Sequence, residues 1–170
     1  LGPGLGRETT TRDFVWQLVS GPEEGQGSHR RIGFGVPAAQ PSREPLDLPP
    51  LVIDADGLNL LADLDDWWTR VPETSVLTPH PGEMARLLGC DLQDVRQDRF
   101  GVVGAAADKW GCTVVLKGAY TLVAAPGGKT TVIPFSTPAL ASAGTGDVLA
   151  GTIAGLMAQG LSGDDAAVCG

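Results

Sequence analysis

The sequence predicts an α/β domain in which helices cover a largely parallel sheet. Short apolar runs typical of buried strands, such as "PLVIDADG" and "CTVVLKG", alternate with segments of helical periodicity, and this alternation favours parallel pairing. Acidic, proline-rich or glycine-rich turns follow these runs, as expected where strands end. With 170 residues, the chain is long enough for one domain with its own core and too short for two ordinary domains.

The N-terminal half is expected to contain two helices separated by a long loop and a strand. Hydrophobic residues recur at helical spacing in "RETTTRDFVWQLV", and its threonines can cap the start of that helix. Residues 21–49 hold many glycines and prolines without a sustained period, which predicts a long loop or insertion. "PLVIDADG" then has the form of a buried strand ending in an acidic turn, and "LNLLADLDDWW" has the form of a short helix.

The C-terminal half repeats the strand, turn and helix arrangement. A strand at 75–78 leads through "TPHPG" into a helix with Glu83 in its first turn, where the macrodipole favours a carboxylate. One long helix is expected from Asp91 to Trp110, although two internal glycines weaken it. "CTVVLKG" is a β-branched strand, "YTLVAAPGGKTTVIPF" resembles a hairpin with its turn at 126–128, and "AGTGDVLAGTIAGLMAQG" supplies a last turn and helix.

Composition excludes several classes of protein. The formal net charge is −8 and the basic residues form no cluster, which argues against nucleic-acid binding. No stretch approaches the roughly 20 apolar residues of a membrane span, and no signal peptide opens the chain. The three cysteines (Cys90, Cys112 and Cys169) lack the spacing of a metal or disulfide framework and are expected to be reduced. These features predict a cytoplasmic protein, and the abrupt ends of the sequence suggest part of a longer domain.

The glycine-rich turn in "AGTGDVLAG" is a candidate anion site. The first turn of a helix carries backbone N–H groups without intrahelical acceptors, and the macrodipole adds positive potential there. Gly144 and Gly146 allow a phosphate to approach the backbone closely, and Thr145 can add a hydroxyl donor. Asp147 follows directly, and a carboxylate beside a phosphate is repelled unless it has a function.

Two interpretations of Asp147 stay open at this point. A carboxylate there can take a proton from a hydroxyl that attacks phosphorus, as in phosphoryl transfer. It can also simply stabilise the start of the helix, because aspartate is common at that position.

Polar residues follow other strands as well. Lys117 lies at the carboxyl end of a strand, where open α/β sheets bind ligands and a lysine can contact a nucleotide phosphate; the alternative is a solvated surface lysine. His80 between two prolines is either a rigidly mounted substrate contact or an ordinary turn residue. Asp54, Asp56 and Asn59 can bind Mg²⁺ or begin the next helix. Because these turns follow strands of one sheet, we expect them to converge on one crevice together with "GPGLG".

The motifs "GPGLG", "VIDADGLNLLA", "LTPHPGEMARLLG", "VVLKGAYTLVA" and "ALASAGTGDVLAGTIAGLMAQG" resemble, in order and spacing, those of the ADP- or ATP-dependent NAD(P)H-hydrate dehydratases. That family has a carbohydrate-kinase-like, ribokinase-type fold, a three-layer α/β/α domain. The resemblance implies an enzyme that repairs hydrated NADH or NADPH. A nucleotide phosphorylates the hydroxyl at carbon 6 of the nicotinamide ring, and phosphate then leaves.

The resemblance also implies roles for individual residues. Asp147 resembles the catalytic base and a substrate contact, and Gly4 and His80 resemble contacts to the hydrated dinucleotide. Gly144, Thr145 and Gly146 resemble the anion hole, and Gly146 also a nucleotide contact. The other implied nucleotide contacts are Lys117, Gly118, Ala119, Tyr120 and Thr121. Mg²⁺ and either ADP or ATP are the implied cofactors, with no assigned protein ligand for the metal, and a homo-oligomer is expected.

Two features depart from the family pattern. Many members have Asn-Pro-Gly before the glycine turn, where this chain has Thr137-Pro138-Ala139, and the link at 21–49 is unusually long. Two alternatives therefore stay open: a small-molecule kinase of the same fold, such as a hydroxyethylthiazole or hydroxymethylpyrimidine kinase, and a nucleotide-binding module without turnover.

Overall fold

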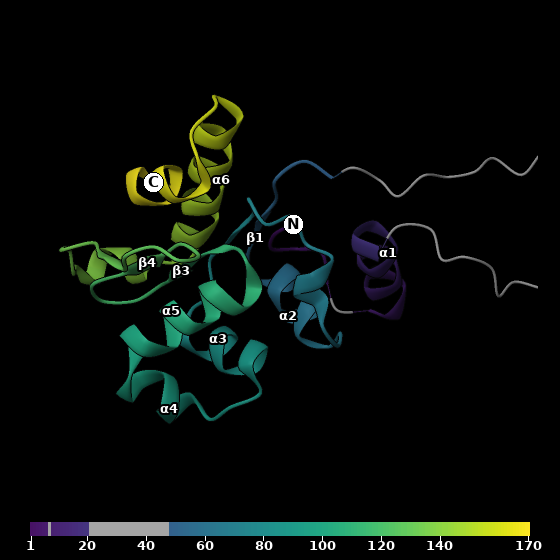
Figure 1. The fold of residues 1–170 in the computed structure, drawn as a ribbon, viewed down its shortest axis with the longest axis horizontal. Helices are drawn as coiled ribbons and strands as arrows, with labels where there is room; N and C mark the ends of the chain where they lie inside the picture. Colours follow the sequence, from purple (N-terminus) through teal and green to yellow (C-terminus); the bar gives the residue numbers. More distant parts are fainter. Residues whose placement is uncertain (7, 21–47) are drawn as a thin grey trace, which may run out of the picture.

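The computed structural model describes residues 1–6, 8–20 and 48–170 (Figure 1). Most of the loop predicted at 21–49 lies outside these residues. The helices are α1 (Thr9–Ser20), α2 (Asp56–Ala62), α3 (Pro81–Leu88), α4 (Leu92–Gln97), α5 (Arg99–Trp110), α6 (Thr145–Ala158) and α7 (Gly163–Cys169), with short 3₁₀ helices η1 (Trp67–Thr69) and η2 (Pro138–Ala141). The strands are β1 (Val52–Ile53), β2 (Val76–Leu77), β3 (Thr113–Leu116), β4 (Leu122–Ala124) and β5 (Thr131–Val132).

The five strands form one sheet in the order β1-β2-β3-β4-β5. Strands β1, β2 and β3 are parallel, and the β4–β5 hairpin extends β3 in antiparallel fashion. The other side of β1 is occupied by Leu1, whose N–H donates to Val52 O and whose carbonyl accepts from Asp54 N, each at 2.9 Å. The predicted α/β class and the predicted hairpin are therefore confirmed.

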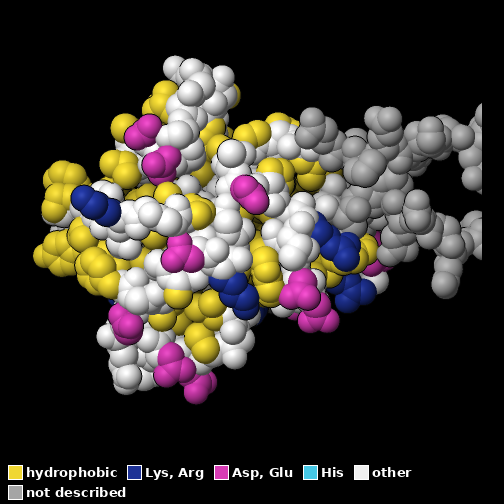
Figure 2. Space-filling view, viewed as in Figure 1, with side chains coloured by type: hydrophobic (Ala, Val, Ile, Leu, Met, Phe, Trp, Pro, Cys, Tyr) yellow, Lys and Arg dark blue, Asp and Glu magenta, His cyan; other side chains and the backbone are white. Residues whose placement is uncertain are grey.

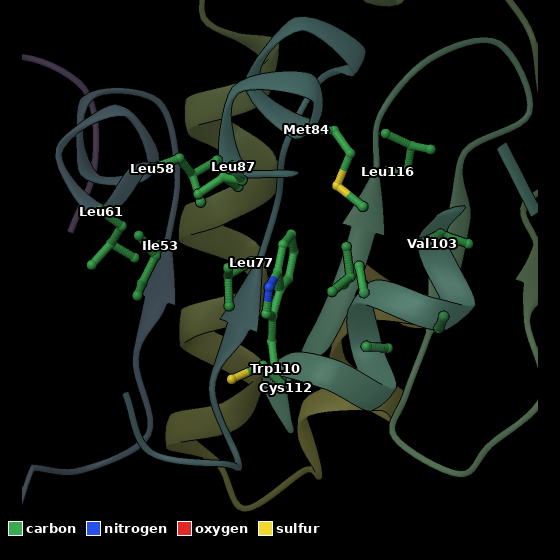
Figure 3. Packing of buried hydrophobic residues seen from close by; sticks show 14 of the residues in the cluster. Ile53, Leu58, Leu61, Leu77, Met84, Leu87, Val103, Trp110, Cys112 and Leu116 are labelled. Atoms are coloured by element: carbon green, nitrogen blue, oxygen red, sulfur yellow. The ribbon is translucent and has the colours of Figure 1, made fainter. Parts of the chain in front are cut away.

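Side chains alternate between the two faces of the sheet, as the pleat requires. Along β3, Val114 and Leu116 pack into a large core with α2, α3 and α5, whereas Val115 packs with Ile153 of α6 on the opposite face. Figure 3 shows the Trp110 ring in the middle of the larger core. Helices α6 and α7 thus cover one face and α2 to α5 the other (Figure 1), so the three-layer prediction is confirmed.

The single long helix predicted from Asp91 to Trp110 is wrong. The structure has two helices, α4 and α5, which meet at Asp98. Asp98 has φ −133° and ψ 67°, outside the helical region, and its Oδ1 accepts a hydrogen bond from Gly101 N at 2.9 Å. A side-chain cap therefore ends one helix and begins the next.

Apolar surface remains exposed around the hairpin and α6. Phe135 and Val148 are each 70% exposed and Leu140 is 61% exposed. Figure 2 shows hydrophobic side chains gathered at the left edge of the molecule, where the hairpin lies in Figure 1. None of the helices in the described ranges is long and apolar enough to traverse a lipid bilayer. The expected homo-oligomer stays a prediction.

We expect Cys112 to resist alkylation in the folded protein. Its thiol is fully buried, donates to Pro72 O at 3.6 Å, and burial raises its pKa to about 12, with a smaller contribution from Glu73. Only about 1 in 10,000 molecules carries the reactive thiolate at pH 8. Iodoacetamide followed by mass spectrometry should modify the exposed Cys90 and Cys169 and reach Cys112 only in denaturant. Rapid modification of Cys112 without denaturant would contradict this burial.

Candidate functional site

The ends of the parallel strands converge on one buried ion pair. Asp54 follows β1 and Lys117 follows β3, and Lys117 Nζ lies 2.6 Å from Asp54 Oδ1. Glu83 of α3 places Oε2 3.9 Å from the same Nζ. Asp54 is 1% and Glu83 6% exposed. The predicted convergence is thus confirmed for these strand ends, and Lys117 is an ion-paired residue rather than a solvated surface lysine.

The N-terminus of α6 is directed at the same ion pair. A Cβ atom added to Gly146 would lie 3.5 Å from Lys117 Nζ and 3.6 Å from Asp54 Oδ2. Gly144 is the N-cap residue and has φ +89°, a conformation that favours glycine. The backbone N–H groups of Gly146 and Asp147 have no acceptor within the described ranges. The start of α6 therefore presents free donors next to Lys117, as an anion site requires.

Asp147 is the third residue of α6 and is exposed to solvent. Asp147 does not cap α6 with its side chain, because Gly144 is the N-cap residue and no side chain caps the helix. It does lie in the first turn of α6, where the macrodipole favours a carboxylate, so that part of the structural interpretation stands. In the part of the chain that the structure describes, the Asp147 carboxylate has neither a hydrogen-bond nor an ion-pair partner. A carboxylate without a structural partner at the mouth of an anion site is available to accept a proton.

The loop before α6 is held by its own hydroxyl groups. Thr145 Oγ1 lies 2.9 Å from both Leu140 O and Ser142 O, so its hydroxyl donates to the loop. The sequence had suggested instead that this hydroxyl is free to bind a phosphate. Thr137, in the unusual Thr-Pro-Ala stretch, caps η2 by accepting a hydrogen bond from Ala139 N at 3.3 Å. Threonine is therefore a suitable N-cap residue for this short helix.

His80 forms the N-cap of α3. Its Nδ1 accepts from Gly82 N at 2.9 Å and Glu83 N at 3.3 Å, and Glu83 Oε2 accepts from His80 N at 2.8 Å, which completes a capping box. The His80 Nε2 lies 3.4 Å from Glu83 Oε1, yet the side chain is 54% exposed. Because Nδ1 accepts two hydrogen bonds, the proton of a neutral ring lies on Nε2.

Replacing His80 separates its capping role from a contact with substrate. We expect His80→Ala to lower the free energy of unfolding by about 1 kcal/mol, since the cap is lost, and His80→Asn to retain most of it because asparagine is a good cap. Urea titration of both variants measures this difference. If the substrate contact is also real, both variants raise the KM for the hydrated dinucleotide; a normal KM in His80→Asn would reject that contact.

Arg99, the first residue of α5, holds the segment from Lys117 to Thr121 through hydrogen bonds to backbone carbonyls. The guanidinium donates to Ala119 O at 2.7 Å and to Leu116 O and Tyr120 O at 3.3 Å each. At the open end of the β4–β5 hairpin, Tyr120 N donates to Phe135 O at 3.3 Å. Thr121 Oγ1 donates to Gly118 O at 3.1 Å. The conformation of this loop is therefore set by several specific hydrogen bonds.

The first glycine turn lies beside the acidic turn after β1. Gly6 N donates to Asp56 Oδ2 at 3.1 Å, and Asn59 Oδ1 accepts from Arg86. Gly4 has φ +79° and nothing within 4 Å of an added Cβ. Asp54 is paired with Lys117. Each of the three side chains that the sequence suggested as Mg²⁺ ligands, Asp54, Asp56 and Asn59, therefore has a partner within the protein. The described ranges contain no group of three His, Cys, Asp or Glu side chains that could hold a metal.

Sequence reasoning missed two residues of this site. Glu83 was expected only to stabilise the start of α3, although the spacing His-x-x-Glu is the pattern of a capping box and could have indicated its contact with His80. Arg99 lies in a segment interpreted as the middle of a helix, and no local pattern connects it with residues 116–120. The roles predicted for the individual site residues stay predictions.

Comparison with known proteins identifies related sequences. The profile of the NAD(P)H-hydrate dehydratase family matches residues 40–170. The bifunctional NAD(P)H-hydrate repair enzyme Nnr of Moorella thermoacetica is 39% identical over all of this chain, which covers 27% of that protein. The corresponding enzyme of Salinibacter ruber is 42% identical over 95% of this chain and 25% of that protein. The chain thus spans about a quarter of the length of these curated relatives.

Solved structures agree on the fold. A ribokinase-like superfamily protein of Enterococcus faecalis superposes with a TM-score of 0.68 at 25% identity, covering 99% of this chain and 49% of that one. The ADP/ATP-dependent NAD(P)H-hydrate dehydratase of Bacillus subtilis, co-crystallized with ATP and Mg²⁺, superposes with a TM-score of 0.52 at 34% identity over 55% of this chain and 34% of that one. The fold is ribokinase-like, and the chain belongs to the NAD(P)H-hydrate dehydratase family.

Proposed function

We propose that the protein containing this chain removes water from hydrated NADH or NADPH in a reaction driven by ADP or ATP. The observation that carries the proposal is the start of α6, where a carboxylate without a structural partner adjoins free N–H donors beside Lys117. The names of the relatives in Moorella thermoacetica and Salinibacter ruber, both NAD(P)H-hydrate repair enzymes, support this choice of substrate.

The first chemical step is a phosphoryl transfer. Asp147 accepts the proton of the ring hydroxyl, the hydroxyl oxygen forms a bond to the terminal phosphorus of the nucleotide, and the bond from that phosphorus to the nucleotide's leaving oxygen breaks. In the second step, the carbon–oxygen bond breaks, phosphate departs, and loss of a proton from the adjacent ring carbon restores the double bond. The net result is one water removed and one phosphoanhydride bond spent.

Groups of this chain are placed to stabilise the negative charge on the phosphate that is transferred. The N–H groups of Gly146 and Asp147 have no acceptor in the described ranges, and the Cβ position of Gly146 lies 3.5 Å from the Lys117 ammonium. Donors fixed in advance stabilise the charge of the transition state without a reorganisation cost. Asp54 holds Lys117 in place at 2.6 Å, so the ammonium is oriented before the nucleotide arrives.

Mg²⁺ fits this arrangement as an ion held mainly by the nucleotide. Magnesium commonly binds through substrate phosphates, waters and only one or two carboxylates. Asp54 reaches the start of α6, with Oδ2 3.6 Å from the Cβ position of Gly146, and Glu83 is the second buried carboxylate at that edge. When bound, Mg²⁺ neutralises phosphate charge. The Bacillus subtilis enzyme co-crystallized with ATP and Mg²⁺ supports its use.

Recovery of nicotinamide absorbance tests the proposal. The complete protein is mixed with NADH hydrate or NADPH hydrate and Mg²⁺, in parallel with ADP, with ATP and without nucleotide. Recovery with one nucleotide supports the repair reaction and names the donor. Folded protein that gives no recovery but phosphorylates an added small alcohol would instead be a kinase, and nucleotide binding without turnover would indicate a binding module. The cytoplasmic location stays part of this proposal.

A further inference from the structure

We propose that Arg99 is a positioning residue for the nucleotide, acting through the loop from Lys117 to Thr121. This inference rests on the proposed function, since it assigns the phosphoryl donor to that loop. It concerns affinity for the nucleotide and leaves the proton transfer at Asp147 unaffected.

The guanidinium binds three backbone carbonyls, one at the end of β3 and two in the loop that follows it. It donates to Leu116 O at the end of β3 and to Ala119 O and Tyr120 O beyond it, at distances of 2.7 to 3.3 Å. The backbone of Arg99 is held at the start of α5, directly after the capping residue Asp98. A planar, charged fork on a helix start is well suited to hold several carbonyls at once.

The loop has a backbone that needs such support. Tyr120 has φ +55°, an uncommon and costly conformation for a residue with a side chain. Gly118 has φ +143°, and a Cβ there would lie 3.3 Å from the Arg99 guanidinium. The backbone conformation at 118 therefore favours glycine, and a side chain there would also crowd the guanidinium. Arg99 stabilises a strained loop that the local sequence alone would not favour.

Two backbone N–H donors of the same loop have no acceptor. Among the described residues, the N–H groups of Gly118 and Ala119 have no acceptor, whereas Lys117 N donates to Pro79 O and Tyr120 N to Phe135 O. Ala119 O and Tyr120 O accept hydrogen bonds from Arg99, and Gly118 O accepts one from Thr121 Oγ1. The loop thus has three of its carbonyls occupied and two N–H donors without an acceptor, as suits a site for an anionic or acceptor-rich ligand.

The test compares nucleotide affinity with turnover in the complete protein. We expect Arg99→Met to weaken ADP or ATP binding about 10-fold, measured by calorimetry and as KM, with a much smaller change in kcat at saturating nucleotide. Arg99→Lys should recover only part of the affinity, because an ammonium cannot span three carbonyls with a planar fork. The KM for the hydrated dinucleotide should stay unchanged.

Arg96→Met is the matched control. Arg96 is exposed on the last turn of α4 and lines the same open depression of about 390 Å³ as Arg99, yet it makes no hydrogen bond to the loop. The Arg96→Met variant should bind ADP or ATP with the affinity of the parent protein. If Arg99→Met and Arg99→Lys both bind nucleotide as tightly as the parent, the inference is overturned, even if they unfold at lower temperature. If the parent protein binds neither ADP nor ATP, the proposed function fails instead.

Discussion

Asp147→Asn is expected to lower kcat about 100- to 10,000-fold, the usual loss when a positioned general base is removed. Asparagine has nearly the same shape but cannot accept the proton of the attacking hydroxyl. Because Asp147 makes no side-chain cap and has no partner in the described ranges, the variant should lose only the macrodipole contribution of a first-turn carboxylate, about 0.3 to 1 kcal/mol, and should melt close to the temperature of the parent protein. Absorbance recovery from NADH hydrate and calorimetric melting measure the two quantities on the same sample.

Asp94→Asn provides the control for this substitution. Asp94 is the third residue of α4, the same helix position that Asp147 has in α6, and it is also exposed. Its replacement removes a carboxylate from a helix start without touching the site, so activity should be retained. Asp147→Asn with full activity would reject the base assignment, and an inactive Asp94→Asn would show that the assay reports stability rather than chemistry.

Lys117→Met is expected to damage both stability and nucleotide binding. Asp54 would keep its charge while losing its 2.6 Å partner in a buried position, and an uncompensated buried charge costs about 3 kcal/mol. The nucleotide would also lose the ammonium nearest the start of α6. Urea unfolding should show the loss of stability, and calorimetry with ADP and ATP should show weaker binding.

The double variant Asp54→Asn with Lys117→Met separates these two effects. Neutral asparagine beside methionine leaves no unpaired charge, so much of the stability should return. Nucleotide binding should stay weak, because the cation is still absent. A double variant that regains nucleotide affinity would show that Lys117 serves only to neutralise Asp54.

Local patterns were sufficient for the elements that have simple periodicity. The strands within "PLVI" and "CTVVL", the hairpin and the last helix follow from alternating or continuous apolar runs bounded by glycine and proline. The convergence of Asp54 and Lys117 was also predictable, since parallel strands of one sheet place their carboxyl ends together.

Other features depend on contacts between distant residues. The break at Asp98 depends on one side chain that accepts a hydrogen bond from Gly101 N, which outweighs the helical propensity on both sides. The Arg99 contacts join residues about 20 positions apart and follow from how α5 packs on β3 and β4. The sequence could place Lys117 at a strand end, but it could not show which acid would hold it.

The hydrogen bond from Tyr120 N to Phe135 O closes the open end of the β4–β5 hairpin. Two segments leave the hairpin at that point: the loop that ends at Thr121, and the stretch from Ser136 that runs through η2 to the start of α6. This one hydrogen bond therefore ties the backbone of the loop proposed to hold the nucleotide to the chain that leads into the glycine turn. The two segments that the proposed function assigns to the nucleotide and to its transferring phosphate share an anchor, although they lie far apart in the sequence.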